Sequence, residues 1–173
     1  MSDSIHQMTA EYNAVQDRIL FRVNTVQKIE YRVWLTRRVV KNLWGVAVSS
    51  FEAVPEVTTH AEPRVRKAVM SMQHQEAVQT SNFKQKHEEG AMPAPDMETP
   101  LLATGIRIKR AGPSVGLTFV TAENKAVSLN FNDQMLHALV HILQGASDKA
   151  GWDLRLAVGD GTQVQRNEAT VLH

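Results

Sequence analysis

Residues 131–143 read FNDQMLHALVHIL, a strand end that runs directly into an amphipathic helix. Asn132 is a residue type that commonly caps the start of a helix, and Asp133 places a negative charge near the positive helix end. Four apolar residues then recur at helical spacing and share one face: Met135, Leu136, Leu139 and Leu143. The stretch therefore predicts a helix packed on the strand before it, and residues 19–47 follow the same plan.

The two stretches align without a gap when Val115 is set beside Ile19, 96 residues earlier. Both strand faces and both helix faces then agree, which indicates an internal structural duplication. Few identities remain, so a chance match of two generic strand-strand-helix units is the alternative. The pairs that match in type are Leu117 with Phe21, Phe119 with Val23, Val127 with Tyr31, Leu129 with Val33, Phe131 with Leu35, Asn132 with Thr36, Met135 with Val39, Leu136 with Val40, Leu139 with Leu43 and Leu143 with Ala47.

The sequence predicts an α+β fold of two tandem antiparallel strand-strand-helix units related by an approximate internal repeat. Residues 1–55 form the first hairpin-helix unit, because residues 18–25 and 29–36 alternate apolar and polar side chains as the strands of a hairpin do. Residues 101–158 form the second strand-hairpin-helix unit, which closes with a short strand over residues 152–158. Residues 159–173 are predicted to be a polar tail.

Between the two units, residues 56–100 are predicted to form a polar helix and a proline-rich linker. Residues 63–86 are rich in Gln, Lys, Glu and Ala with a thin apolar stripe, which favours a helix docked along a narrow seam or extended towards a partner. Partial disorder of this segment is the alternative. Residues 90–100 contain three prolines and a glycine, a composition typical of a flexible linker, and we expect the two halves to be hinged there.

Composition and charge exclude several classes of protein. The chain of 173 residues has 19 basic and 18 acidic residues and a net charge of +1, so no global field points to nucleic acid or to an anionic membrane. The absence of cysteine excludes disulfides and thiolate metal sites and suits a reducing compartment. No apolar run is long enough to span a bilayer, and residues 1–14 lack the apolar centre of a signal peptide. We therefore expect a cytoplasmic protein with no membrane partner.

Motifs for catalysis or cofactor binding are weak. His137 and His141 have the four-residue spacing that lets two imidazoles on a helix bind one metal ion, but helical projection turns both towards solvent and no third ligand is near. The segment from Gly112 to Gly116 resembles a glycine-rich phosphate loop, yet it connects two antiparallel strands instead of opening a helix. The sequence therefore predicts no metal, no cofactor and no enzymatic activity.

The strongest candidate site is the outer face of the first hairpin, where arginines lie beside a tryptophan. Tryptophan and arginine are enriched at protein interfaces, which favours a non-catalytic binding or assembly module whose partner is another protein or a second copy in a homo-oligomer. Guanidinium groups beside an aromatic ring on a sheet also suit single-stranded nucleic acid, which is the alternative, although Glu30 between the arginines repels phosphate. Plain surface or intramolecular packing is the third interpretation. The candidate binding residues are Arg22, Arg32, Trp34, Arg37, Arg38 and Lys41.

The layout of two strand-then-helix units in tandem is similar to that of the PUR-repeat and Whirly single-strand-binding folds, in which antiparallel strands precede one long helix and two units pair. Those units carry four strands before the helix, whereas this sequence predicts two or three. No motif of either family can be matched residue by residue. The similarity is therefore one of architecture, and fold alone does not carry function.

Overall fold

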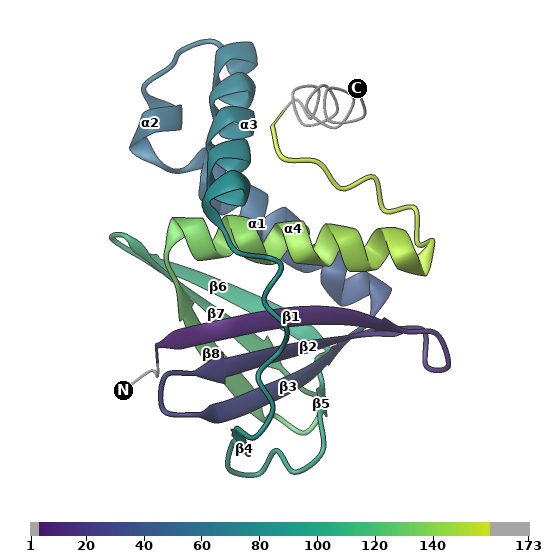
Figure 1. Cartoon of the computed structure of the whole chain (residues 1–173). Coiled ribbons are helices and arrows are strands. Elements are labelled where there is room, and N and C mark those ends of the chain that lie inside the picture. Colours follow the sequence, from purple (N-terminus) through teal and green to yellow (C-terminus); the bar gives the residue numbers. More distant parts are fainter. Residues whose placement is uncertain (1–3, 160–173) are drawn as a thin grey trace.

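The computed structural model describes residues 4–159, which form a mixed α+β fold with two sheets and four helices (Figure 1). The elements of the first half are β1 (Ile5–Asn13), β2 (Arg18–Thr25), β3 (Ile29–Leu35), α1 (Arg37–Glu52), α2 (Pro55–Thr58) and α3 (Pro63–Thr80). The remaining elements are β4 (Met92–Pro93), β5 (Leu101–Leu102), β6 (Gly105–Ala111), β7 (Ser114–Val120), β8 (Ala126–Phe131) and α4 (Asp133–Ala150).

The strands form two separate sheets. In the first sheet β1, β2 and β3 are antiparallel neighbours, and the short strands β4 and β5 both pair in parallel with β3. In the second sheet β6, β7 and β8 are antiparallel neighbours. Both hairpins predicted from the alternation of apolar residues are confirmed, and the N-terminal strand β1 precedes the first of them.

The two hairpins have the same register at the offset of 96 residues. Ile19 pairs with Leu35 in the first sheet, and Val115 pairs with Phe131 in the second. The helices that follow start at matching positions, each after a capping side chain. The Thr36 hydroxyl accepts a hydrogen bond from the Val39 amide at 3.3 Å, and the Asn132 side chain accepts one from the Met135 amide at 2.8 Å. Both predicted helix caps are thus confirmed.

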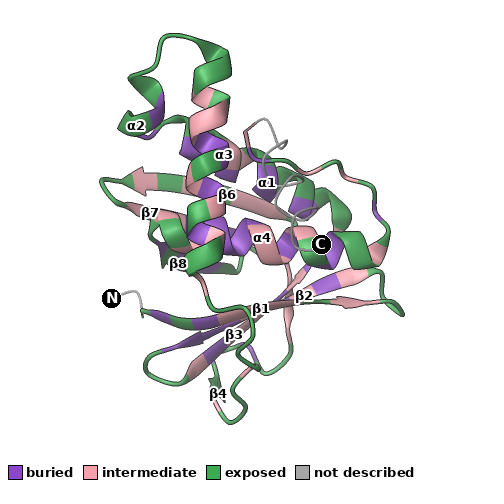
Figure 2. Cartoon of the chain, turned by 45° about the horizontal axis from the view of Figure 1, so that its top comes forward, coloured by how far each residue is buried: buried purple, intermediate pink, exposed green. Residues whose placement is uncertain are grey.

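A single core joins the two units. The inner faces of the two sheets meet at Phe21 and Phe119, whose ring centroids are 5.7 Å apart. Helices α1 and α4 pack crosswise: α1 contacts β6 of the second sheet, and α4 contacts β1 of the first. Figure 2 shows buried residues along α1 and α4, whereas α2 and the turn after it are largely exposed. Each of these helices packs mainly on the sheet of the other unit, whereas the sequence predicts packing on the strand before it.

The segment expected to be a flexible linker lies against the first sheet. Met92 donates its amide proton to the Lys28 carbonyl, and Ala94 donates to the carbonyl of Glu30. Ala94 and Met97 are buried in the core. Residues 92–93 and 101–102 therefore pair with β3, while the residues between them form a turn and a bend. These buried and hydrogen-bonded residues do not fit the flexible linker that the composition predicts.

Two further features differ from the sequence prediction. Helix α3 ends at Thr80, not near residue 86, because Ser81 has an extended backbone and its hydroxyl bonds the Ala77 carbonyl. Pro55 follows the end of α1 and starts the short helix α2. The strand expected over residues 152–158 is absent there, since Asp153 and Arg155 both adopt positive φ angles that a strand does not allow. The polar tail, except for Gly159, lies outside the described residues.

None of the helices within residues 4–159 is long and apolar enough to cross a membrane.

Candidate functional site

The outer face of the first sheet consists of three rows of side chains set by the strand register. Because successive residues of a strand point to opposite faces, the buried residues Val23 and Val33 place their neighbours on the outer side. The rows are Gln7, Asn24 and Glu30; Thr9, Arg22 and Arg32; and Glu11, Leu20 and Trp34. The predicted outward direction of Arg22, Arg32 and Trp34 agrees with this register.

Arg22 and Arg32 are held by one carboxylate. An Arg22 nitrogen lies 2.7 Å from Glu30, and Arg32 Nε lies 3.5 Å from the other oxygen of the same carboxylate. The Glu30 side chain is only 9% exposed, and the two arginine side chains are 19% and 25% exposed. A buried carboxylate between two guanidinium groups neutralises much of their charge, so this part of the face is less basic than the sequence alone suggests.

An extended segment after α3 crosses this face, and we call residues 82–90 the strap (Figure 1). His87 Nε2 lies 2.9 Å from a Glu30 oxygen. Gln7 hydrogen-bonds the strap backbone on both sides of His87, and Asn24 donates to the Glu88 carbonyl at 3.0 Å. The strap therefore covers the first row of the outer face and part of the second.

The remaining predicted residues lie beyond the strap, around the start of α1. Arg37, Arg38 and Lys41 are exposed, and Trp34 is partly buried beside Leu102 of β5. Leu102, Arg37 and Arg38 line a surface depression of about 590 Å³. Trp34 thus lies next to the strand that forms one wall of this depression, and the basic residues form another.

The first turn of α1 has an unusual charge. It contains Arg37 and Arg38 and no acidic residue, although the partial charge of a helix N-terminus is positive. The matching turn of α4 carries Asp133, as helix electrostatics favours. Among residues 4–159, Arg38 and Lys41 form no ion pair within 4.0 Å, although Asp17 lines the same depression as Arg38.

Arg37 has an intramolecular role as well. Its guanidinium carbon lies 5.9 Å from the centre of the Trp152 ring. The Trp152 indole donates a hydrogen bond to Asp17 at 2.7 Å, and the Tyr12 hydroxyl donates to the same oxygen at 2.8 Å. These two hydrogen bonds, Trp152 first, lower the pKa of the Asp17 carboxyl. The residues after α4 are thereby fixed to the turn between β1 and β2.

The structure contradicts the solvent-facing placement of His137. Its ring is stacked on Phe51 at 3.8 Å between centroids, and its Nδ1 lies 3.0 Å from Nδ1 of His74. His137 is 5% exposed because α3 packs on the side of α4 opposite its apolar face. Periodicity within one helix cannot show that a second helix covers its polar side. His141 is partly buried with its ring 4.7 Å from that of Phe83.

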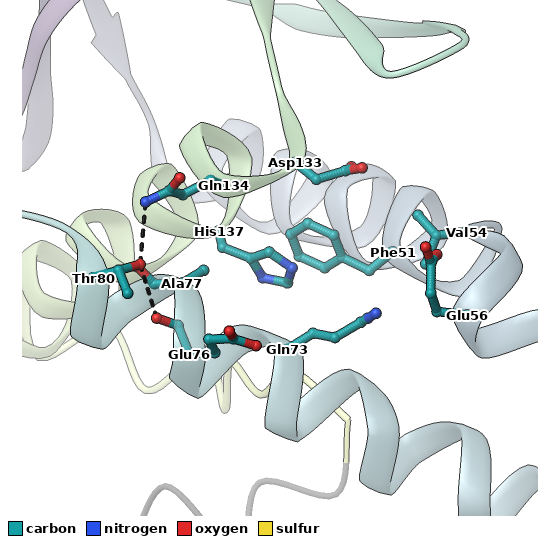
Figure 3. A pocket seen from close by; sticks show the side chains of 10 residues that line it. All are labelled: Phe51, Val54, Glu56, Gln73, Glu76, Ala77, Thr80, Asp133, Gln134 and His137. Carbon is teal, nitrogen blue, oxygen red and sulfur yellow. Dashed lines mark hydrogen bonds between the residues drawn. The ribbon is translucent and has the colours of Figure 1, made fainter.

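His137 and Phe51 line a pocket of about 480 Å³ between α1, α2, α3 and α4 (Figure 3). Carboxylates from three helices surround it: Glu56, Glu76 and Asp133. Asp133 is engaged by Arg110 at 2.7 Å, and Glu56 and Glu76 are exposed. Burial lowers the pKa of both His74 and His137 to about 4, so at neutral pH the pair is uncharged. No group of three or more metal-ligating side chains occurs within residues 4–159.

No family model, no curated protein and no solved structure matches this chain.

Proposed function

We propose that the chain is a non-catalytic binding or assembly module that acts through the outer face of the first sheet. The observation that carries the proposal is the group of cations at the start of α1, beside the depression next to Trp34. We call Trp34, Arg37, Arg38 and Lys41 the basic ledge. Helix electrostatics disfavours two arginines in a first turn, and a binding partner with negative charge would offset that cost.

The partner that fits the basic ledge best is an acidic segment of another protein or of a second copy of this chain. Arginine and tryptophan at the edge of a sheet supply charge and a large apolar surface, which together are typical of the residues that dominate protein interfaces. Arg22 and Arg32 belong to the same face, but Glu30 and the strap already engage them. We therefore assign initial docking to the ledge.

Single-stranded nucleic acid remains the second candidate, because Trp34 beside exposed cations suits a stacked base and its phosphates. The carboxylates of Glu30, Glu88 and Glu89 argue against it, since all three lie on the face along which the strand would run. They repel phosphate, whereas a protein partner can place its own cations or neutral groups opposite them.

A non-catalytic role is supported by the chemistry of the pocket at His137. Its imidazole is hydrogen-bonded to a second imidazole, not to a nucleophile, and two of the three carboxylates nearby are exposed. Exposed carboxylates are surrounded by water, so the pocket does not provide the water-excluded environment that acid–base catalysis favours.

We also propose that the two units are duplicates of one ancestral strand-strand-helix unit. Equal registers of the two hairpins at one offset, and side-chain caps of the same kind on α1 and α4, support this interpretation. The lack of cysteine is consistent with a place in the cytoplasm, which we propose as its compartment.

Two labelled polyanions, the peptide (Glu-Thr)₈ and the oligonucleotide dT₁₆, test the proposal when titrated by fluorescence anisotropy at two salt concentrations. We expect the peptide to bind and the double variant Arg38→Ala/Lys41→Ala to weaken that binding. The matched control is Arg107→Ala/Lys109→Ala, which removes two exposed cations from the outer face of the second sheet. Tighter binding of dT₁₆ with a steep salt dependence would favour the nucleic-acid alternative. Equal losses of peptide affinity in both double variants would contradict the proposal, and so would the absence of binding of either probe at low salt.

A further inference from the structure

The outer face of the first sheet holds the strap through its backbone. Gln7 Nε2 donates to the Lys86 carbonyl at 2.7 Å, and Gln7 Oε1 accepts from the Glu88 amide at 2.9 Å. A neighbouring strand would engage the same two backbone groups of an extended chain. Because Gln7 contacts only main-chain atoms, its two hydrogen bonds do not depend on the side chains that the extended segment carries.

Side chains around Gln7 add a preference for charge. Glu30 engages His87, His6 lies 3.2 Å from the Glu88 carboxylate, and Arg22 donates to Glu89 at 3.5 Å. The surface therefore favours an extended segment with a hydrogen-bonding or cationic side chain followed by two acidic residues. His6 and Arg22 supply weak charge complementarity to those acids.

Asn24 shows that the strap fits this surface incompletely. Its Nδ2 donates to the Glu88 carbonyl, but its Oδ1 has no hydrogen-bond partner among the described residues, although Asn24 is only 3% exposed. Gln7 is satisfied because it meets a carbonyl and the amide two residues later. The corresponding amide for Asn24 belongs to Gly90, and that amide does not reach Asn24 Oδ1 in the described structure. Gly90 has a φ of +95°, which residues other than glycine rarely adopt.

We propose that this surface is a binding site for an extended segment of another protein in which a cationic or hydrogen-bonding residue is followed by two acidic residues, and that the strap is a resident occupant which such a segment displaces. The inference rests on the proposed function and names the partner chemistry for the same face. A segment with a regular extended backbone through the positions of Glu89 and Gly90 can present the amide that Asn24 Oδ1 lacks. The incoming segment thus makes one hydrogen bond more than the strap does.

The strap is built to be displaced without unfolding the chain. Its residues are exposed except for His87, and its contacts to the sheet are polar. Ala94 and Met97 are buried and hold the chain beyond it, while α3 holds the chain before it. Local opening between two such anchors breaks the polar contacts of the strap with the sheet and the ring contact of Phe83 with His141, but no contact of the hydrophobic core. Tethering gives the strap a high effective concentration, which a competing segment must overcome.

A labelled peptide that copies residues 82–95 with Gly90→Val tests the inference. The peptide is titrated with the full chain that carries His87→Ala/Glu88→Pro. The first substitution removes the contact of the strap with Glu30, and the second removes the amide proton that the strap donates to Gln7 Oε1. We expect the peptide to bind this variant at least about tenfold tighter than wild type, as relief of an effective concentration predicts. Adding Gln7→Ala to this variant should abolish the gain in peptide affinity, whereas adding Lys109→Ala, on the second sheet, should leave that gain unchanged.

The peptide with the native Gly90 is the second probe. We expect it to bind the variant several-fold more weakly than the Val peptide, and Asn24→Val should remove that difference. Equal binding of the two peptides, or no binding to a variant that melts as wild type does, would overturn the inference. In wild type, excess Val peptide should speed hydrogen exchange of the Glu88 amide, and unchanged exchange at millimolar peptide would overturn it as well. If neither strap peptide binds the variant while binding of (Glu-Thr)₈ still depends on Arg38 and Lys41, the proposed function is supported and only this inference is contradicted.

Discussion

The Nδ1 atoms of His74 and His137 lie 3.0 Å apart between α3 and α4. At this distance one nitrogen carries the proton and donates it to the other, so the contact requires that at least one ring be neutral. A doubly protonated pair would set two N–H groups against each other. Burial is the main cause that lowers the pKa of each ring to about 4, and the nearby Asp133 partly offsets it at His137.

This pair predicts that stability falls on mild acidification. Because the folded pKa values lie near 4 and the ordinary value is 6.5, the unfolded chain binds more protons between these limits. The contribution is complete above about pH 6.5, decreases as the pH drops and is lost near pH 4. It amounts to at most about 3 kcal/mol per ring. Urea unfolding at pH 7, 5.5 and 4.5 should show a smaller decrease for His74→Gln than for wild type, and parallel decreases would refute this account.

Replacing His137 by alanine should destabilise the protein, contrary to the expectation from a solvent-facing ring. The substitution removes the stack on Phe51 and leaves His74 without its partner, at a cost on the order of 2 kcal/mol. His60→Ala, at an exposed histidine, is the control and should change the free energy of unfolding by less than about 0.5 kcal/mol. Equal melting temperatures of the two variants would show that the ring is not packed as described.

Leu139→Asp should unfold the chain. Leu139 is fully buried on the apolar face of α4, and an unpaired carboxylate there costs several kcal/mol, roughly the whole stability of a domain. The control on the same helix is Gly145→Asp, at an exposed position where an added Cβ meets nothing within 4 Å. Circular dichroism should show a folded control and an unfolded Leu139 variant, and two folded proteins would mean that the helix phase is wrong.

Arg38→Glu should stabilise the fold while it weakens binding. The change replaces a cation by an anion in the first turn of α1, which is worth about 0.5 kcal/mol or somewhat more. Arg38→Ala should give a smaller gain by removing the cation alone. The combination of a higher melting temperature and weaker binding of the acidic peptide is the expected result for a residue kept for function. A lower melting temperature of both variants would show that Arg38 supports the fold instead.

Local structure was largely predictable from the sequence, because it depends on neighbours along the chain. Alternation of Ile19, Phe21 and Val23 and the capping types of Thr36 and Asn132 were sufficient to place both hairpins and both long helices. Each of these patterns lies within about fifteen consecutive residues. Contacts between segments that are distant in the chain produce no periodic pattern of apolar residues in the sequence.

The features that the sequence did not predict all depend on such distant contacts. Glu30 was recognised between Arg22 and Arg32, but its contact with His87 comes from a residue 57 positions away. Trp44 is buried, and its indole donates a hydrogen bond to the Ala157 carbonyl, 113 positions later. The sequence predicts helix and linker where the strap lies, because polar composition does not distinguish an exposed helix from an extended chain that lies on a sheet.

The central claim is that the outer face of the first sheet binds a partner through the basic ledge, and Trp34→Ala tests it most directly. Trp34 lies outside the core, so the change should lower the free energy of unfolding by less than about 1.5 kcal/mol. Trp44→Ala is the matched control, at a buried tryptophan, and should cost about 3–5 kcal/mol.

The measurement pairs thermal unfolding with anisotropy of the labelled acidic peptide on the same samples of wild type and Trp34→Ala. The account predicts a nearly unchanged melting temperature together with binding weakened by about 2 kcal/mol, which is roughly thirtyfold in Kd. A large loss of stability with peptide binding intact would contradict both the outward placement of the indole and the proposed functional face.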